Sequence, residues 1–475
     1  MRSWFDRNRP QALMLLGIGI VVVITVASRL PVLGVGEIDW DEGVYWLSMQ
    51  TMQSGHALYA SVYSSQPPAF LLFTEPPWAL LGGGIVAARA VMLAWGAIAV
   101  VSGGVIGWRL GGRVAALAAA GTLAVDPMMV RQSVILQADG PATALGVAAV
   151  ALGALALTLR GPRWRTLAAA LAGTVLALGF LTKLLDVAIV PPLLVVLASR
   201  GAGRRLLPAA IVGGLLAAAA TLLPLHDAWQ AMWNQSVGLH LDTRSATSGI
   251  SVLDALRIRW HLAVVALVGA VIGWRRHRLL VTTGVVWLTG ALLAMSVTHP
   301  LWPHHAVVMS PAYALLSAAG VSAAFEWLGR LTRRHVRAAT AAFAAGLMAA
   351  AGLFLWSGLR GLQPTTDFRA LASALGAHTS ASAQLVGDDQ YVQALAHRAA
   401  PPGYVDTSNT RLYAEPGALQ GLEAVADGSR PVCAVLFSSG RFAHLPGFTA
   451  WVSRRYPVVV DLGASRSLYI APGCG

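Results

Sequence analysis

The sequence has little charge, and acidic residues are the scarcer kind. Only 12% of the 475 residues are charged, against roughly 25% in a typical soluble domain, while 56% are hydrophobic. Acidic residues number 21 and basic residues 34, which gives a net charge of +13. The basic residues fall in short clusters between apolar runs and form no stripe interleaved with aromatic residues, so nucleic acid is not an expected partner. The composition predicts that lipid is the main solvent of this chain.

Lysine and cysteine are scarce as well. Lys183 is the only lysine, in a chain whose richness in alanine, glycine and arginine is typical of a high-GC genome. A lysine that persists under such a bias suggests a task that arginine does not serve. Cys433 and Cys474 are the only cysteines, and both lie in the last segment. A disulfide between them and two free thiols are equal alternatives from the sequence.

Long apolar runs occupy most of the first 360 residues. A transmembrane helix needs roughly 20 apolar residues, with a range of about 17–25. Apolar runs bounded by Arg, Gly or Pro predict about eleven such helices, near residues 11–33, 84–108, 112–127, 138–159, 167–182, 184–199, 206–224, 260–274, 279–297, 305–328 and 338–358. Residues 1–360 are therefore expected to form an α-helical polytopic membrane domain.

The distribution of arginine predicts how this domain is oriented. If the N-terminus is cytoplasmic, the loops on its side carry most of the basic residues of the membrane part, and the opposite loops carry few. This bias predicts a cytoplasmic N-terminus and an extracytoplasmic C-terminus in the inner (plasma) membrane of a bacterium. The first apolar run is too long for a signal peptide and no cleavage site follows it, so we expect it to stay as an anchor.

The composition changes after about residue 360. Runs such as AQLVGDD and PVCAVLFSSG are typical of short strands, and DFRALASALGAH and GALQGLEAVADG are typical of amphipathic helices. Residues 361–475 are therefore predicted to form a small extracytoplasmic α/β domain of about 110 residues, an ordinary domain size.

The longest outer loop of the membrane part, residues 34–83, concentrates acidic residues. Four carboxylates lie within six positions, those of Glu37, Asp39, Asp41 and Glu42. One interpretation is a solvated loop in which Asp41 caps a short helix that runs to about Gln53 and ends at Gly55. The other is a reaction site, because carboxylates held near lipid have raised pKa values and can serve as bases or metal ligands.

The same loop resembles a known family. The matching residues are Asp41-Glu42, Tyr45, Met52, Gly55, Pro67-Pro68 and Arg89. In this order they resemble the GT-C superfamily, most closely glycosyltransferase family 39, which includes protein O-mannosyltransferases and lipid A aminoarabinose transferases. The resemblance implies an inverting enzyme that takes a sugar from a polyprenyl-phosphate donor. It further implies that Asp41 is the catalytic base, with Glu42 beside it in the catalytic group.

Four residues of this region are expected to bind substrate: Asp39, Tyr45, Gln66 and Arg89. Gln66 stands where aminoarabinose transferases carry a lysine before the Pro-Pro pair, which argues against lipid A as the acceptor. The C-terminal segment is also unlike the sugar-binding MIR module of eukaryotic O-mannosyltransferases, so nothing in it favours a protein acceptor.

Two further candidates lie in later outer segments. Asp139 opens a predicted helix and could simply cap it, but the resembling family has an acid here that faces the catalytic aspartate. Lys183 could snorkel to the membrane interface, yet its compact ammonium also suits a phosphate, and the family has a lysine at a similar place near the donor phosphate. We therefore predict that Asp139 is catalytic and that Lys183 binds the donor phosphate.

Three histidines lie close together in the segment THPLWPHHAVV. They are His299, His304 and His305. No acid or cysteine neighbours them in the sequence and their spacing fits no closed zinc pattern, so we predict hydrogen bonds to phosphate or sugar and no metal ligands. A divalent cation is compatible with this chemistry but no cofactor is required, because basic side chains can stabilise a phosphate leaving group.

The sequence thus predicts an integral-membrane glycosyltransferase of GT-C type. Its expected partners are a polyprenyl-phosphate sugar donor, membrane lipid and an extracytoplasmic acceptor that is a cell-envelope glycan, lipid or protein. Two other classes stay open: a lipid or sugar transporter of the flippase kind, and a non-catalytic envelope assembly protein. The charged candidates gather at one face of the membrane and no internal repeat is visible, which favours the enzyme.

Overall fold

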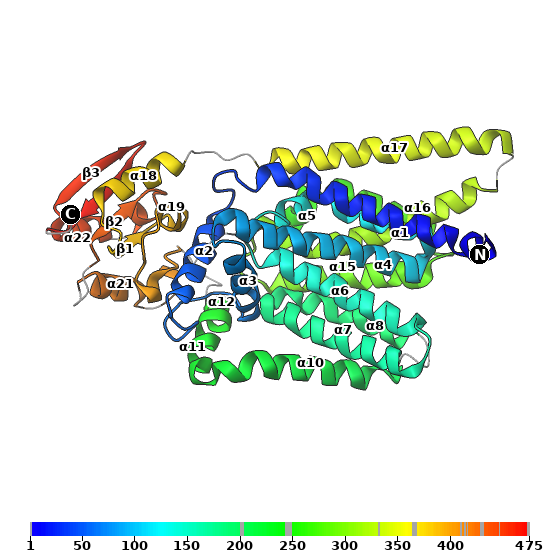
Figure 1. Cartoon of the computed structure of the whole chain (residues 1–475), viewed down its shortest axis with the longest axis horizontal. Coiled ribbons are helices and arrows are strands. Elements are labelled where there is room, and N and C mark those ends of the chain that lie inside the picture. The colour runs from blue at the N-terminus through cyan, green and yellow to red at the C-terminus, as the bar shows by residue number, and fades with distance from the viewer. Residues whose placement is uncertain are drawn as a thin grey trace.

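The chain folds as a helical bundle with a small sheet-containing domain at one end. The computed structural model describes residues 2–199, 204–242, 249–330, 333–362, 368–408, 411–412, 415, 417–427, 432–445 and 447–472. The C-terminal domain lies beyond the end of the bundle that carries α2 (Trp40–Gln53) and α3 (Ala69–Leu80), and the N-terminus lies at the other end (Figure 1).

The bundle consists of long apolar helices. Among the described residues, eight helices are long and apolar enough to cross a membrane, or nine if the bent pair α13 (Val252–Ile258) and α14 (Trp260–Gly273) is one span. Seven of them lie within α1 (Arg2–Arg29), α4 (Ile85–Val125), α6 (Asp139–Thr158), α7 (Pro162–Thr182), α15 (Arg278–Val297), α16 (Ser310–Leu328) and α17 (Arg333–Arg360), with short extensions at some ends. The eighth begins with α10 (Leu207–Leu222) and continues to Gly238. The chain is therefore a multi-pass membrane protein, as predicted.

The helix α4 explains part of the difference from the predicted count. Gly112 within it has φ +88°, outside the helical region. A Cβ added to Gly103 would lie 2.3 Å from the side chain of Leu123, although a straight helix would hold these residues about 30 Å apart. The chain therefore reverses at Gly112, and α4 contains two antiparallel arms that correspond to the predicted runs 84–108 and 112–127.

The predicted run at 184–199 is shorter than a regular span. It is a 3-10 helix, η2 (Leu184–Ile189), which continues into α8 (Val190–Ala198). Three smaller helical elements carry or approach the candidate residues: α5 (Pro127–Gln132), α12 (Leu239–Asp242) and the 3-10 helix η6 (Pro303–Met309). Each lies where a long helix ends or begins, at the same end of the bundle as α2.

The C-terminal domain contains a four-stranded sheet. Its strands are β1 (Leu385–Gly387), β2 (Ala434–Phe437), β3 (Val458–Gly463) and β4 (Arg466–Ile470), in the order β1-β2-β4-β3. The pair β1–β2 is parallel and the other pairs are antiparallel. The helices α18 (Phe368–His378), α19 (Gln390–Leu395), α21 (Ala418–Ala426) and α22 (Phe448–Arg455) complete the predicted α/β domain. Cys433 is disulfide-bonded, and Cys474 lies outside the described residues.

The C-terminal domain and the α2–α3 region share one hydrophobic core. Buried side chains from both parts, such as Trp46, Phe70, Tyr391 and Leu436, belong to a single cluster. A Cβ added to Gly43 would lie 2.2 Å from the backbone nitrogen of Tyr391, so α2 and α19 touch at a point that excludes any larger residue. This contact holds the C-terminal domain over the segment that carries the acidic motif.

Candidate active site

A cavity of about 310 Å³ lies between the bundle end and the C-terminal domain. Its wall includes seven residues that the sequence predicted, Asp41, Tyr45, Gln66, Lys183, His299, His304 and His305. They come from α2, the loop before α3, the start of η2, and the segment from the end of α15 to η6. The fold therefore brings together candidates that are up to 264 positions apart in the chain.

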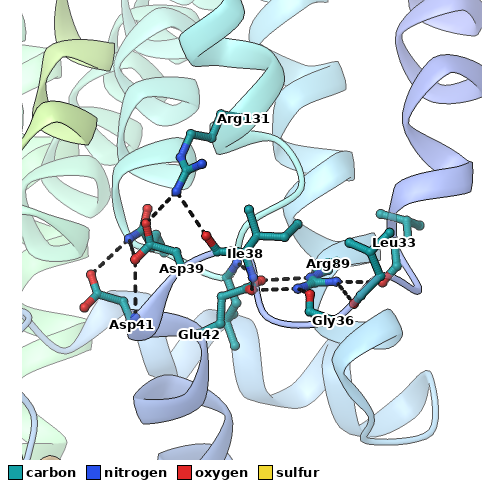
Figure 2. Close-up of polar contacts among 11 residues, drawn as sticks. Leu33, Gly36, Ile38, Asp39, Asp41, Glu42, Arg89 and Arg131 are labelled. Atoms are coloured by element: carbon teal, nitrogen blue, oxygen red, sulfur yellow. Dashed lines mark hydrogen bonds and ion pairs between the residues drawn. The ribbon is translucent and has the colours of Figure 1, made fainter. Parts of the chain in front are cut away.

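Asp41 lies in the first turn of α2 and faces this cavity. The Asp39 side chain caps the helix by accepting the backbone N–H of Asp41 at 3.3 Å. The Gln137 amide donates to Asp41 Oδ2 at 3.0 Å and to Asp39 Oδ1 at 2.8 Å (Figure 2). Burial, and after it the charge of Asp39, raises the pKa of Asp41 to about 7. A carboxyl group with this pKa can accept a proton near neutral pH.

Asp39 holds Asp41 in place and does not line the cavity. Its other oxygen forms an ion pair with Arg131 Nη2 at 2.8 Å (Figure 2). Arg131 comes from α5, so the pair ties the start of α2 to the bundle. The sequence predicts that Asp39 binds substrate, whereas its contacts in the structure are those of a helix cap and of an ion pair with α5.

Glu42 and Arg89 lie away from the cavity, although the sequence predicts Glu42 in the catalytic group and Arg89 as a substrate contact. Both side chains are fully buried, and Arg89 donates to the two Glu42 oxygens at 2.8 and 2.6 Å. Arg89 also donates to the carbonyls of Leu33, Val35 and Gly36 (Figure 2). Glu42 accepts further hydrogen bonds from two backbone N–H groups, of Ile38 and Leu136. Neither residue lines the cavity, and their contacts fix the loop before α2.

Asp139 lies behind two residues of the cavity wall, Lys183 and His304. Lys183 Nζ donates to Asp139 Oδ2 at 2.8 Å, and Asp139 is almost completely buried behind it. This places the predicted catalytic residue Asp139 as a partner that orients Lys183. The ion pair fixes the position of Lys183 Nζ at the cavity wall.

Asp139 also contributes to the one cluster of metal-ligating groups found in the described part of the chain. The ligand atoms of Asp139, His304 and His305 lie within 4.8 Å of one another. These are the residues that would hold a divalent cation. The fit is incomplete, because Lys183 already occupies Asp139 Oδ2 and His305 Nδ1 already accepts the N–H of Trp302 at 3.2 Å. A cation at Asp139 Oδ2 would compete with Lys183 for that oxygen.

Several residues of the cavity wall were not predicted. Asp406, Ser408 and Arg441 of the C-terminal domain all line it, as does His240 of α12. The sequence did hold a signal for part of this set, because acidic and hydroxyl residues directly follow β1 and β2, in GDDQ and FSSGR. Adjacent parallel strands bring their carboxyl ends to one edge of a sheet, where ligands commonly bind in α/β folds.

The raised pKa of Asp41 predicts a pH-dependent gain in stability when the residue is replaced. The folded state binds a proton that the unfolded chain releases between its ordinary value of 3.8 and about 7, so stability falls as the pH rises through this range. Asp41→Asn should therefore raise the Tm in detergent at pH 8, and the gain should shrink toward pH 4. The matched control is Asp427→Asn at an exposed site, which should give no such gain. Equal Tm values for Asp41→Asn and wild type at pH 8 would rule out a destabilising carboxylate.

Part of the sequence matches a known family, and the whole fold is similar to solved structures. Residues 65–229 match the family model described as dolichyl-phosphate-mannose-protein mannosyltransferase. No curated protein sequence matches. ArnT from Cupriavidus metallidurans bound to undecaprenyl phosphate superimposes with a TM-score of 0.68 at 14% identity, over 98% of this chain and 99% of that one. Its apo state gives a TM-score of 0.67 at 14% identity, over 97% and 98%.

An archaeal protein has a similar structure over part of its length. The oligosaccharyltransferase AglB from Archaeoglobus fulgidus, in complex with an inhibitory peptide and a dolichol-phosphate, gives a TM-score of 0.60 at 13% identity. The match covers 95% of this chain and 71% of AglB. At these identities the likenesses show a shared fold.

Proposed function

Because the chain has the membrane fold of the GT-C glycosyltransferases, we propose that it transfers a sugar from a polyprenyl-phosphate donor to an extracytoplasmic acceptor, with inversion and with Asp41 as the base. The observation that carries this proposal is the single cavity onto which Asp41 and Lys183 both open. A carboxylate that accepts a proton and a fixed cation that binds phosphate are the two groups that such a transfer needs.

The proposed reaction is one displacement. Asp41 takes the proton of the acceptor hydroxyl. At the same time the oxygen of that hydroxyl forms a bond to the anomeric carbon of the sugar. The bond between that carbon and the phosphate oxygen breaks, and its electron pair leaves with the polyprenyl phosphate. Lys183, held by Asp139, stabilises the negative charge of the leaving phosphate as a compact cation. His299, His304 and His305 line the same cavity and supply further hydrogen-bonding nitrogens.

The compared proteins support this choice of donor. The matched family is described by a dolichyl-phosphate sugar, and one similar structure holds undecaprenyl phosphate while another holds dolichol-phosphate. The exposed apolar faces of helices such as α10 and α14 suit a lipid surrounding, from which a prenyl chain can reach the bundle.

The proposed orientation follows from the loops between the helices. Basic residues gather in the loops at the end of the bundle opposite the C-terminal domain, for instance around Arg163 and Arg275. The positive-inside rule then places that end in the cytoplasm and the cavity on the other side of a bacterial inner membrane. An extracytoplasmic cavity suits a lipid-linked donor, which needs no soluble nucleotide sugar.

Deletion of the gene tests the proposal as a whole. The deletion strain should accumulate a polyprenyl-phosphate sugar and lose a sugar from an envelope glycan, lipid or protein, and the wild-type gene should reverse both changes. Mass spectrometry of the lipid extract and sugar analysis of the envelope measure them. If no lipid-linked sugar accumulates and no envelope sugar is lost, the transferase proposal fails, and a transporter or assembly role gains ground.

Lys183 should determine the affinity for the phosphate. Lys183→Met is expected to weaken binding of undecaprenyl phosphate by about tenfold or more, since a charged hydrogen bond contributes about 1.5–3 kcal/mol. Binding to the purified chain in detergent measures this effect. Arg276→Gln, just before the start of α15 and so at the end of that helix away from the cavity, is the matched control and should bind like wild type.

A second variant separates the two roles of Lys183. In Lys183→Met/Asp139→Asn no unpaired carboxylate is left behind, so its affinity should stay as low as that of Lys183→Met. Wild-type affinity in the double variant would contradict a phosphate contact, because it would mean that Lys183 only neutralises Asp139.

A further inference from the structure

The C-terminal domain closes the cavity with side chains of its own. Three of its residues, Asp406, Ser408 and Arg441, share the cavity wall with Asp41. The domain is fixed against α2 by more than apolar packing, since Trp46 meets Tyr391 edge to face at 5.5 Å and the Gln50 amide donates to the Ala394 carbonyl at 3.3 Å. Groups on this domain therefore have a defined position relative to Asp41.

One buried carboxylate shapes the loop that carries Arg441. Asp388 directly follows β1, and its Oδ1 accepts the backbone N–H groups of Ser438 and Ser439 at 2.7 and 3.0 Å. Its Oδ2 accepts the N–H of Phe442 at 3.2 Å. The loop after β2 is thus wrapped around Asp388, which is fully buried. This arrangement sets the backbone on both sides of Arg441.

The Arg441 guanidinium is held on one side and open on the other. Its Nε donates to the Asp388 carbonyl at 2.9 Å, and its Nη2 donates to that carbonyl and to Gln390 Oε1. Its Cζ lies over the Trp40 ring, 4.8 Å from the ring centroid. Its Nη1 has no hydrogen-bond partner among the described residues. Because Arg441 lines the cavity, a preorganised pair of N–H donors is free to meet a ligand there.

Asp406 presents a hydrogen-bond acceptor to the same cavity. The residue is only 4% exposed, and its Oδ1 accepts the N–H of Ser408 at 2.8 Å. Its Oδ2 has no partner in the described part of the chain. The Asp406 carbonyl accepts from Arg411 Nη1 at 2.7 Å, and Arg411 in turn stacks on Tyr63 of the first outer loop at 3.6 Å. Because Asp406 lines the cavity, its second carboxylate oxygen is placed to accept a hydrogen bond from a ligand there.

We propose that Asp406 and Arg441 form a sugar-recognition roof, in which the carboxylate accepts and the guanidinium donates hydrogen bonds to hydroxyl groups of a sugar ring. The inference rests on the proposed transferase function and adds specificity-determining residues to it. A sugar hydroxyl both donates and accepts, so the hydroxyls of one ring match an acceptor and a donor pair in the wall of one cavity. The ring belongs either to the sugar being transferred or to a glycan acceptor, and the chemistry is the same for both.

The test uses the purified full chain and two probes, undecaprenyl phosphate and the lipid-linked sugar recovered from the deletion strain. Asp406→Asn and Arg441→Lys should each lower sugar transfer to deletion-strain membranes by about tenfold or more. Both variants should bind undecaprenyl phosphate within twofold of wild type, which also shows that they are folded. Asp427→Asn, an exposed aspartate of the same domain, is the matched control and should transfer like wild type.

Hydrolysis of the lipid-linked sugar without acceptor separates the two sources of the ring. If hydrolysis falls together with transfer, the roof binds the sugar being transferred; if only transfer falls, it binds a glycan acceptor. Wild-type transfer by both variants would overturn the roof while leaving the proposed function intact. Weaker binding of undecaprenyl phosphate would also overturn it, since the effect would not be confined to the sugar. A wild-type protein that transfers no sugar would overturn both proposals.

Discussion

Replacing Asp41 with asparagine is expected to lower sugar transfer by about 10²–10⁴-fold, the contribution typical of a positioned general base. Asparagine has nearly the same shape and can still accept the hydrogen bond from Gln137, so the start of α2 should keep its geometry. What the variant loses is the capacity to take a proton. Transfer from the lipid-linked sugar to deletion-strain membranes measures the effect, and undecaprenyl phosphate binding should change little.

The neighbouring carboxylate gives the matched control for Asp41. Asp39→Asn removes the charge that pairs with Arg131 but keeps an oxygen that can cap α2. We expect it to reduce transfer only several-fold, through the position of Asp41. If Asp41→Asn transfers sugar at the wild-type rate, or if Asp39→Asn is the more damaging of the two, Asp41 is not the base.

Replacing Arg89 with methionine is expected to destabilise the protein by about 3–5 kcal/mol, because it leaves the charge of Glu42 buried and unpaired. Both side chains are fully buried, so water does not screen the pair. The loop before α2 would also lose the donor that binds its three carbonyls. A lower Tm in detergent and a lower yield of folded protein are the measurements.

The double variant Arg89→Met/Glu42→Gln shows whether the unpaired charge is the cause. Without a buried charge, the double variant should regain most of the stability that the single variant loses. If the double variant is no more stable than Arg89→Met, the loss comes from the loop carbonyls or from packing, and the ion pair is not what holds the loop.

Much of the membrane part could be predicted because its signals are local. The apolar runs, the short helix that ends at Gln53, and the isolated Lys183 can each be recognised within a short stretch of sequence. The start of that helix differs from the prediction, because Asp39 and not Asp41 caps it. Asp41, Lys183 and the three histidines were then expected at one end of the bundle, and they do line one cavity.

The remaining features depend on pairings between distant residues. The sequence shows Glu42 as one of four similar carboxylates, and only the fold pairs it with Arg89, 47 positions later, and so removes both from the cavity. Asp406 and Arg441 reach the cavity because the C-terminal domain packs against α2 at Gly43. Neither the periodicity nor the composition of the sequence predicts that contact.

The anomeric configuration of the transferred sugar tests the central claim most directly. Purified wild-type protein would be given the polyprenyl-phosphate sugar recovered from the deletion strain, and the configuration at C1 of donor and product compared by NMR. A single displacement, with the acceptor hydroxyl deprotonated by Asp41 and attacking from the side opposite the phosphate, predicts inversion. Retention would contradict it, because retention requires two displacements through a covalent intermediate, in which a carboxylate acts as the nucleophile.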